Sequence, residues 1–188
     1  MKTKTGLGLR LLLTACLLTA GFSLTGCSSI QPKDYAGETP KLSLESFFNG
    51  TLDVHGMVHD RSGKVLRRFT MVMNASWNGS VGTLNEELLW SDGEKESKTW
   101  ILTKTAEGKY EGTMGDVVGR ATTEVSGNAF QMLYVVKVPV GKGEDRKVYE
   151  FDVEDWMHMI DDKTLLSRTT MTKFGVRVAN VTVSYRKR

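Results

Sequence analysis

The chain has 188 residues, with 25 lysines and arginines against 22 aspartates and glutamates, which gives a formal net charge of +3. Three of the basic residues and none of the acidic ones lie in residues 1–26, so the remaining 162 residues carry 22 charges of each sign. This balance removes the electrostatic basis for nucleic-acid binding, and the length suits one domain with a sizeable core.

A secretory leader is predicted at the start of the chain. Basic residues precede an apolar run over residues 11–22, which is too short to span a membrane because a spanning helix needs ~20 residues. The run leads into Leu24-Thr25-Gly26-Cys27, which resembles the lipobox of bacterial lipoproteins. That resemblance implies that residues 1–26 are a lipoprotein signal peptide and that Cys27 is acylated, which anchors the protein to a membrane. The alternative is an ordinary secretory signal with Cys27 as a free thiol.

The residue after Cys27 indicates the membrane on which we expect the protein to be anchored. Ser28 resembles the sorting pattern of outer-membrane lipoproteins, so we expect a bacterial envelope protein on the outer membrane, facing the periplasm. The other cysteine, Cys16, is removed with the signal. No internal disulfide and no cysteine nucleophile is therefore expected in the mature chain.

Three segments follow from the composition. Residues 27–41 are polar, contain Pro32, Gly37 and Pro40, and are predicted to form a flexible tether. Ser43 is a candidate cap for a short helical turn that carries Phe47 and Phe48 and ends at Asn49-Gly50. The turn is a candidate plug or lid for the domain predicted over residues 42–188.

Ten β-rich segments separated by turn residues follow from residue 50 onward. The connections are too short for parallel crossovers, so neighbouring strands should be antiparallel. The predicted strands cover residues 50–59, 64–77, 81–90, 97–104, 109–114, 119–125, 129–138, 147–159, 164–173 and 177–186.

This pattern favours an all-β fold, an antiparallel up-and-down β-barrel of 8–10 strands with a lipocalin- or calycin-like architecture. Closure removes the exposed edges that a flat sheet of this size would have. A two-sheet sandwich is the alternative. Alternation along 64–77 and 129–138 places apolar side chains on one face of each strand, and we expect these faces to point inward.

Several short motifs resemble a family of uncharacterised proteobacterial lipoproteins that is similar in architecture to lipocalin-like barrels. The resemblance implies the barrel but no established reaction or ligand. In lipocalins the first strand opens with Gly-x-Trp, whereas this chain has Leu52 at the Trp position. The motifs are Phe47-Phe48-Asn49-Gly50, Asp60-Arg61-Ser62-Gly63-Lys64-Val65, Gly82-Thr83-Leu84, Asp155-Trp156-Met157 with Asp161-Asp162, and Lys173-Phe174-Gly175-Val176-Arg177-Val178.

Aromatic and methionine side chains on the inward faces form the candidate ligand site, because rigid rings and flexible thioethers suit an apolar guest. The alternative is that they fill a solid core. We predict a barrel that binds a fatty acid or another lipid without converting it chemically. The candidate lining residues are Phe69, Met71, Met73, Trp77, Trp90, Trp100, Met132, Tyr134, Trp156 and His158.

No cofactor, metal site or catalytic residue is predicted. His55 and His59 lie on one strand face, but roughly 13 Å apart at ~3.4 Å per residue, too far to share a metal ion. His158 could ligate haem, although a partly buried structural histidine explains it more simply. The acidic residues around Asp155 are explained by hairpin ends, and no nucleophile elbow or phosphate loop is present.

Two alternative functions are compatible with the sequence. The first is an envelope assembly or interaction factor with an inert core, whose protein partners the sequence does not identify. The second is a cofactor-free lipid isomerase or cyclase in which His158 or Asp155 takes part.

Overall fold

The structure is a computed structural model that describes residues 29–141 and 145–188. Residues 31–188 form one compact unit. The predicted signal peptide and the predicted acylation site at Cys27 lie outside the described residues. No helix in the described ranges is long and apolar enough to cross a membrane.

Ten strands and two short helices make up this unit, and each predicted strand overlaps an observed one. The elements are η1 (Pro32–Tyr35), α2 (Leu44–Phe47), β1 (Gly50–Asp60), β2 (Val65–Asn78), β3 (Val81–Trp90), β4 (Lys95–Ala106), β5 (Lys109–Thr113), β6 (Val117–Ser126), β7 (Ala129–Val140), β8 (Lys147–Asp161), β9 (Thr164–Lys173) and β10 (Val176–Lys187).

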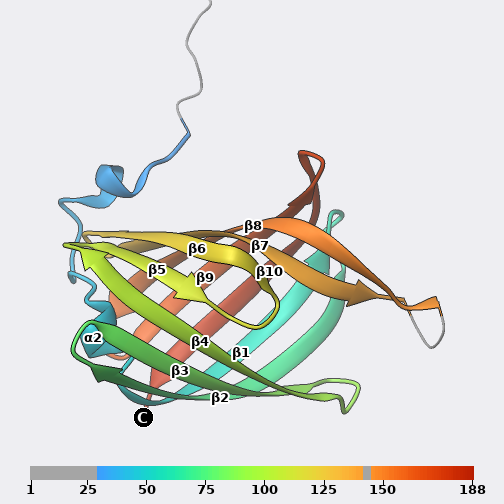
Figure 1. Cartoon of the computed structure of the whole chain (residues 1–188), viewed down its shortest axis with the longest axis horizontal. Helices are drawn as coiled ribbons and strands as arrows, with labels where there is room; N and C mark the ends of the chain where they lie inside the picture. Colours follow the sequence, from blue (N-terminus) through green and yellow to red (C-terminus); the bar gives the residue numbers. More distant parts are fainter. Residues whose placement is uncertain (1–28, 142–144) are drawn as a thin grey trace, which may run out of the picture. The chain divides into compact units, whose positions relative to one another are not determined.

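The strands form a closed barrel in which every strand pairs with its sequence neighbours and β10 pairs with β1 (Figure 1). The pairing between β1 and β10 is antiparallel, with Val54 opposite Tyr185 and Gly56 opposite Val183. This closure confirms the predicted antiparallel barrel and excludes the two-sheet sandwich. Because the sheet closes on itself, it has no free edge strand.

Helix α2 covers one end of the barrel, as Figure 1 shows. The Ser43 hydroxyl caps the helix by accepting a hydrogen bond from the Ser46 amide at 3.3 Å. Phe47 is 2 % exposed and joins the core. The Trp77 indole donates to the Phe48 carbonyl at 2.9 Å, and the Lys187 ammonium donates to the Ser46 carbonyl at 2.6 Å. The expected helical plug is therefore present and is fastened to β2 and β10.

Side chains alternate between the interior and the outer face along the strands. On β2, Phe69, Met71 and Met73 are buried, whereas Arg68 and Thr70, which flank Phe69, are exposed. A row of cross-strand neighbours, in which Met73 pairs with Leu52 and with Glu86, shows that the interior faces of β1, β2 and β3 are in register. This register determines which side chains line the interior.

The segment before α2 departs from the expected flexible tether. Residues 32–35 form the helix η1, whose Tyr35 ring lies 5.7 Å from the Trp156 ring and 4.8 Å from the His158 ring on β8. The Leu42 amide donates to the Gly127 carbonyl at 2.8 Å. A Cβ atom at Gly127, which has a positive φ, would overlap the Tyr35 carbonyl oxygen. From residue 31 onward the chain is therefore folded against the barrel, and these tertiary contacts outweigh its loop-like composition.

Candidate functional site

The interior of the barrel has two halves that differ in packing. The half at the α2 end, here called the closed half, contains buried apolar side chains, including two from α2 itself. The opposite half, here called the open half, is lined by inward-facing side chains that keep accessible surface although they pack against the core. Members of the closed half are Leu44, Phe47, Leu52, Met73, Leu84, Phe130 and Leu165. Members of the open half are Glu86, Leu88, Trp90, Trp100 and Tyr134.

Eight of the ten candidate lining residues share this interior. Four of them are buried, namely Phe69, Met71, Met73 and Met132. The other four, Trp77, Trp90, Trp100 and Tyr134, are partly buried and pack against the core. The structure therefore brings together residues from β2, β3, β4 and β7 around one interior.

Trp156 and His158 do not belong to this set, which corrects the expected lining. On β8 the buried residues are Val153, Asp155 and Met157, so the alternation places Trp156 and His158 on the outer face. There the two rings stack on each other at 6.1 Å and contact Tyr35 of η1. Partial burial lowers the pKa of His158. Its surroundings are those of a packed surface histidine.

A set of polar side chains projects into the interior between the two halves. Burial raises the pKa of Glu86 to about 7, and its charge interacts with those of Lys98, Glu96 and Asp155. Burial raises the pKa of both Tyr134 and Tyr185, and the charges of Glu86 and Asp155 raise both further. All four side chains project into the interior, because their cross-strand neighbours Met73, Val153, Met132 and Val54 are buried. We call the set formed by Glu86, Tyr134, Asp155 and Tyr185 the interior polar cluster.

Asp155 is the member of the cluster that accepts hydrogen bonds from neighbouring side chains. The Ser167 and Thr169 hydroxyls donate to the same Asp155 oxygen, Oδ1, at 2.6 and 2.9 Å. Only 7 % of the residue is exposed, and burial raises the pKa of its carboxyl group. Neither hydrogen bond involves Oδ2, so one side of this carboxyl group has no partner among the described residues.

The other three members make no hydrogen bond or ion pair with any residue in the described ranges. In these ranges, only Arg67 Nε and Asn128 Oδ1 are fully enclosed side-chain polar atoms without a partner. The polar atoms of Glu86, Tyr134 and Tyr185 are therefore not enclosed. Tyr185 is only 8 % exposed, and its side chain projects inward. Buried polar groups normally have partners, which makes these three groups the unusual feature of the interior.

Charged and aromatic side chains surround the open half beyond the cluster. The Arg67 guanidinium lies 4.1 Å from the centre of the Trp90 ring and pairs with Asp92 at 2.6 Å. The Trp90 indole donates to Glu96 at 3.1 Å, and Glu96 also pairs with Lys98 at 3.1 Å. These contacts fix the orientation of Trp90, which packs edge-on to Phe69 at 5.1 Å.

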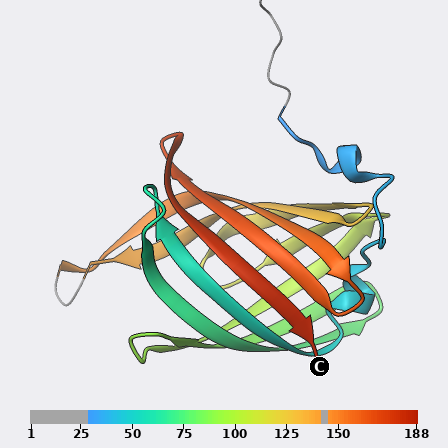
Figure 2. The same cartoon turned by 180° about the vertical axis from the view of Figure 1, so that it is seen from behind.

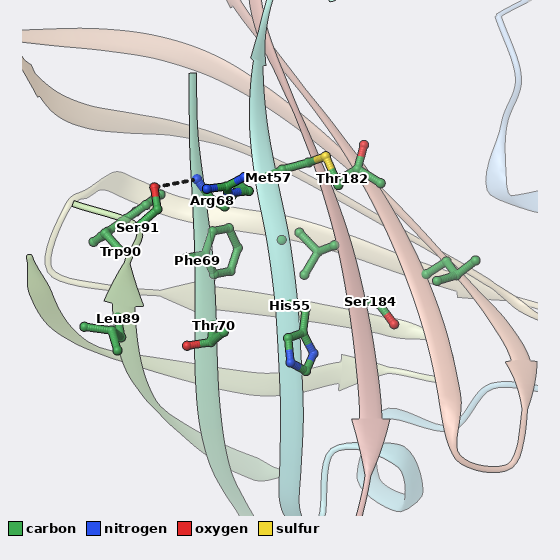
Figure 3. Close-up of a pocket in the computed structure, with 13 residues that line it drawn as sticks. His55, Met57, Arg68, Phe69, Thr70, Leu89, Trp90, Ser91, Thr182 and Ser184 are labelled. Atoms are coloured by element: carbon green, nitrogen blue, oxygen red, sulfur yellow. Dashed lines mark hydrogen bonds between the residues drawn. The ribbon is translucent and has the colours of Figure 1, made fainter. Parts of the chain in front are cut away.

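The outer face carries a separate groove of about 590 Å³ over β1, β2, β3, β9 and β10 (Figure 3). It follows the cross-strand row formed by Trp90, Phe69, Gly56 and Val183, between two rows of outward side chains. Figure 3 labels the members of these rows, with His55, Thr70 and Leu89 in one row and Met57, Arg68 and Ser91 in the other. His55 is exposed on this outer face. No group of three or more potential metal ligands is found in the ranges the structure describes.

Sequence reasoning missed Glu86 and Tyr185. The sequence did contain a signal for Glu86, because it is the one charged residue on a face of β3 that is otherwise uncharged. That face consists of Gly82, Leu84, Glu86, Leu88 and Trp90. Asp155 was assigned to a charged hairpin end, because the sequence does not reveal that Ser167 and Thr169 lie opposite it. The interior is therefore less uniformly apolar than predicted.

A sequence profile described as "Protein of unknown function (DUF3833)" matches residues 21–187. The match covers every strand of the barrel. No curated protein matches the sequence.

Solved structures with a similar fold include the S-type phycobiliprotein lyase CPES from Guillardia theta, at a TM-score of 0.57 and 12 % identity, over 85 % of this chain and 98 % of that one. Another is Rv2717c from M. tuberculosis, at a TM-score of 0.51 and 15 % identity, over 80 % of this chain and 99 % of that one. At these identities the likeness concerns the barrel fold alone.

Proposed function

The chain belongs to the DUF3833 family of proteins of unknown function, and we propose that it is a lipid-anchored barrel of the bacterial envelope that binds a small ligand inside the barrel without chemical conversion. The ligand has an apolar body, as a fatty acid or another lipid has. The anchor is the acylated Cys27, and the location is the periplasmic side of the outer membrane.

One observation carries the binding proposal. Trp90, Trp100 and Tyr134 face inward and pack against the core, yet they keep accessible surface. At the α2 end, by contrast, Leu44, Phe47 and Leu52 are almost completely enclosed. A barrel filled by its own side chains would enclose both halves equally. Aromatic rings beside accessible space are suited to holding an apolar ligand.

The binding proposal is tested with the chain from Ser28 onward, which contains the whole compact unit. The protein is incubated with a bacterial lipid extract, repurified, and analysed by mass spectrometry for co-purifying molecules. We expect one class of lipid in a fixed ratio to protein.

A pair of adjacent substitutions locates the bound molecule. Leu88 faces the interior, whereas Leu89 is 48 % exposed and lines the outer groove. Leu88→Trp should fill the open half and abolish co-purification, and Leu89→Trp should leave it unchanged. Recovery of no lipid by the unmodified protein contradicts the proposal.

The anchor is tested separately with the full chain. Metabolic labelling with a fatty-acid analogue should modify the unaltered protein, and Cys27→Ser should lose both the label and membrane association. A labelled Cys27→Ser variant would contradict acylation at this residue.

The outer groove supports a second function, an envelope interaction factor. Met57, Leu89 and Leu166 along the groove are exposed apolar side chains, which often mark binding surfaces. This function predicts that Leu89→Trp causes the same cellular phenotype as gene deletion while Leu88→Trp causes none. The ligand-binding function predicts the reverse.

A further inference from the structure

Binding of a purely apolar ligand would not explain the interior polar cluster. An acyl chain needs only an apolar lining, yet Glu86, Tyr134 and Tyr185 project inward and make no hydrogen bond or ion pair within the described ranges. Leaving a polar group without a partner in the interior costs free energy that an apolar replacement would avoid. A ligand that supplies the missing partners would explain why the side chains are there.

The charge of the cluster indicates which partner would fit. Glu86 and Asp155 are carboxyl groups, and the cation that interacts with Glu86, Lys98, is held at 3.1 Å by Glu96 and at 3.6 Å by Asp116. Lys98 is the cross-strand neighbour of Glu86 but forms no ion pair with it. The carboxyl groups therefore outnumber the cations here, so a ligand carboxylate is disfavoured and a cation is favoured.

The two tyrosines add directional contacts. Tyr185 is held by edge-on packing against Phe48 at 6.0 Å, and Tyr134 by edge-on packing against Trp100 at 5.4 Å. Both rings are fixed by apolar neighbours while their hydroxyls remain without partners among the described residues. A hydroxyl oxygen can accept a hydrogen bond, so both can serve an N–H donor.

We infer that the interior polar cluster binds a protonated amine carried by an apolar body, with the ammonium between the two carboxyl groups and the apolar part along Trp90 and Trp100. This inference rests on the proposed ligand-binding function and narrows its ligand class. The closed half is the more tightly packed of the two, so the apolar body extends into the open half. An amine-bearing lipid is thereby preferred over a fatty acid.

The test compares decylamine, 1-decanol and decanoate, which share one alkyl chain and differ in head group. Dissociation constants are measured by calorimetry with the chain from Ser28 onward at pH 8. We expect decylamine to bind at least ~10-fold more tightly than 1-decanol, since a hydrogen bond to a charged group contributes about 1.5–3 kcal/mol. Decanoate should bind most weakly.

A matched pair of variants on β3 isolates the head-group contact. Glu86→Gln should remove most of the preference for decylamine and leave 1-decanol binding unchanged. Glu87→Gln alters an outward residue, which accepts a hydrogen bond from Ser97 at 2.7 Å, and should leave all three constants unchanged. Circular dichroism of each variant checks the fold.

The pH dependence provides a second readout. Decylamine, like a lysine side chain, stays protonated between pH 6 and 8, whereas Glu86, with a pKa of about 7, ionises over this range. Decylamine binding should therefore strengthen as pH rises and should be flat in Glu86→Gln. The other titratable groups facing Glu86 are Glu96 and Lys98 on β4, Tyr134 on β7, Asp155 on β8 and Tyr185 on β10.

The outcomes separate the two proposals. If 1-decanol or decanoate binds as tightly as decylamine, or if Glu86→Gln keeps the preference, the amine inference is overturned while ligand binding stands. If none of the probes and no extracted lipid binds, both proposals fail.

Discussion

The two halves of the barrel interior use the same strands for different purposes. Beneath α2, Phe47, Leu52 and Phe130 are almost completely buried, and the helix is fastened by the indole of Trp77. In the open half, by contrast, aromatic side chains retain accessible surface and three polar groups lack partners among the described residues. The closed half supplies stability, and the open half retains the accessible surface that a ligand needs. Figure 2 shows from behind that β1, β2 and β10 run from one end of the barrel to the other.

Removal of a closed-half aromatic ring should have the largest effect on stability. Phe47→Ala is expected to reduce the free energy of unfolding by about 3–5 kcal/mol, because it leaves a cavity in the packed core beneath the helix. Urea denaturation measures the change. Phe174→Ala is the control, since that ring is 91 % exposed, and it should change stability by less than ~0.5 kcal/mol. Equal effects would contradict the assignment of the closed half as the stabilising core.

Ionisation of Glu86 should lower the free energy of unfolding as the pH rises. Burial raises its pKa from 4.5 to about 7, so the folded state binds more protons than the unfolded state between these values. Stability is therefore lost as pH rises from about 4.5 to 7, by up to about 3 kcal/mol at ~1.4 kcal/mol per pKa unit. Glu86→Gln should be more stable than the unmodified protein at pH 8 and similar at pH 4.5 in urea denaturation. A pH-independent difference would contradict the buried carboxyl group.

Two leucines on the same face of β3 compare the space in each half. Leu84 is 5 % exposed in the closed half, whereas Leu88 is only partly buried in the open half. Leu84→Trp should overpack the core and cost about 1–3 kcal/mol, whereas Leu88→Trp should enter accessible space and cost less than ~1 kcal/mol. Thermal melts of the two variants measure the difference. An equal cost at both positions would indicate that the open half is as tightly packed as the closed half.

A pair of tyrosines compares a hydroxyl group that has a partner in the structure with one that has none among the described residues. The Tyr110 hydroxyl donates to Glu45 of α2 at 2.9 Å, whereas the Tyr185 hydroxyl has no partner in the described chain. Tyr110→Phe should cost about 1.5–3 kcal/mol, because the hydrogen bond is to a charged group. Tyr185→Phe should change the free energy of unfolding by less than ~0.5 kcal/mol. A large cost for Tyr185→Phe would reveal a structural role for its hydroxyl and weaken its assignment to a ligand.

Local patterns predicted the fold well, because strand and turn signals are carried by neighbouring residues. The period of two along β2 placed Phe69, Met71 and Met73 inside, and the structure agrees. The phase of β8 was harder to assign, since Trp156 and Met157 are both suitable for an interior. Only the positions of their cross-strand partners, such as Ser167 opposite Met157, settle which of them faces inward.

The candidate site was less predictable than the fold, because it depends on contacts distant in sequence. Glu86, Asp155 and Tyr185 lie on β3, β8 and β10, and no local pattern places them in one interior. The packing of residues 31–41 on β8 was missed for the same reason. Their composition is that of a loop, and only the contact of Tyr35 with Trp156 reveals the order.

The most direct test of the account is a crystal structure of the chain from Ser28 onward grown with decylamine that carries a bromine atom at the end of its chain. The account predicts the ammonium within hydrogen-bond distance of Glu86 and the bromine in the open half beside Trp90 or Trp100. An open half filled by the protein's own side chains, with bromine only in the groove lined by His55 and Leu89, would contradict it.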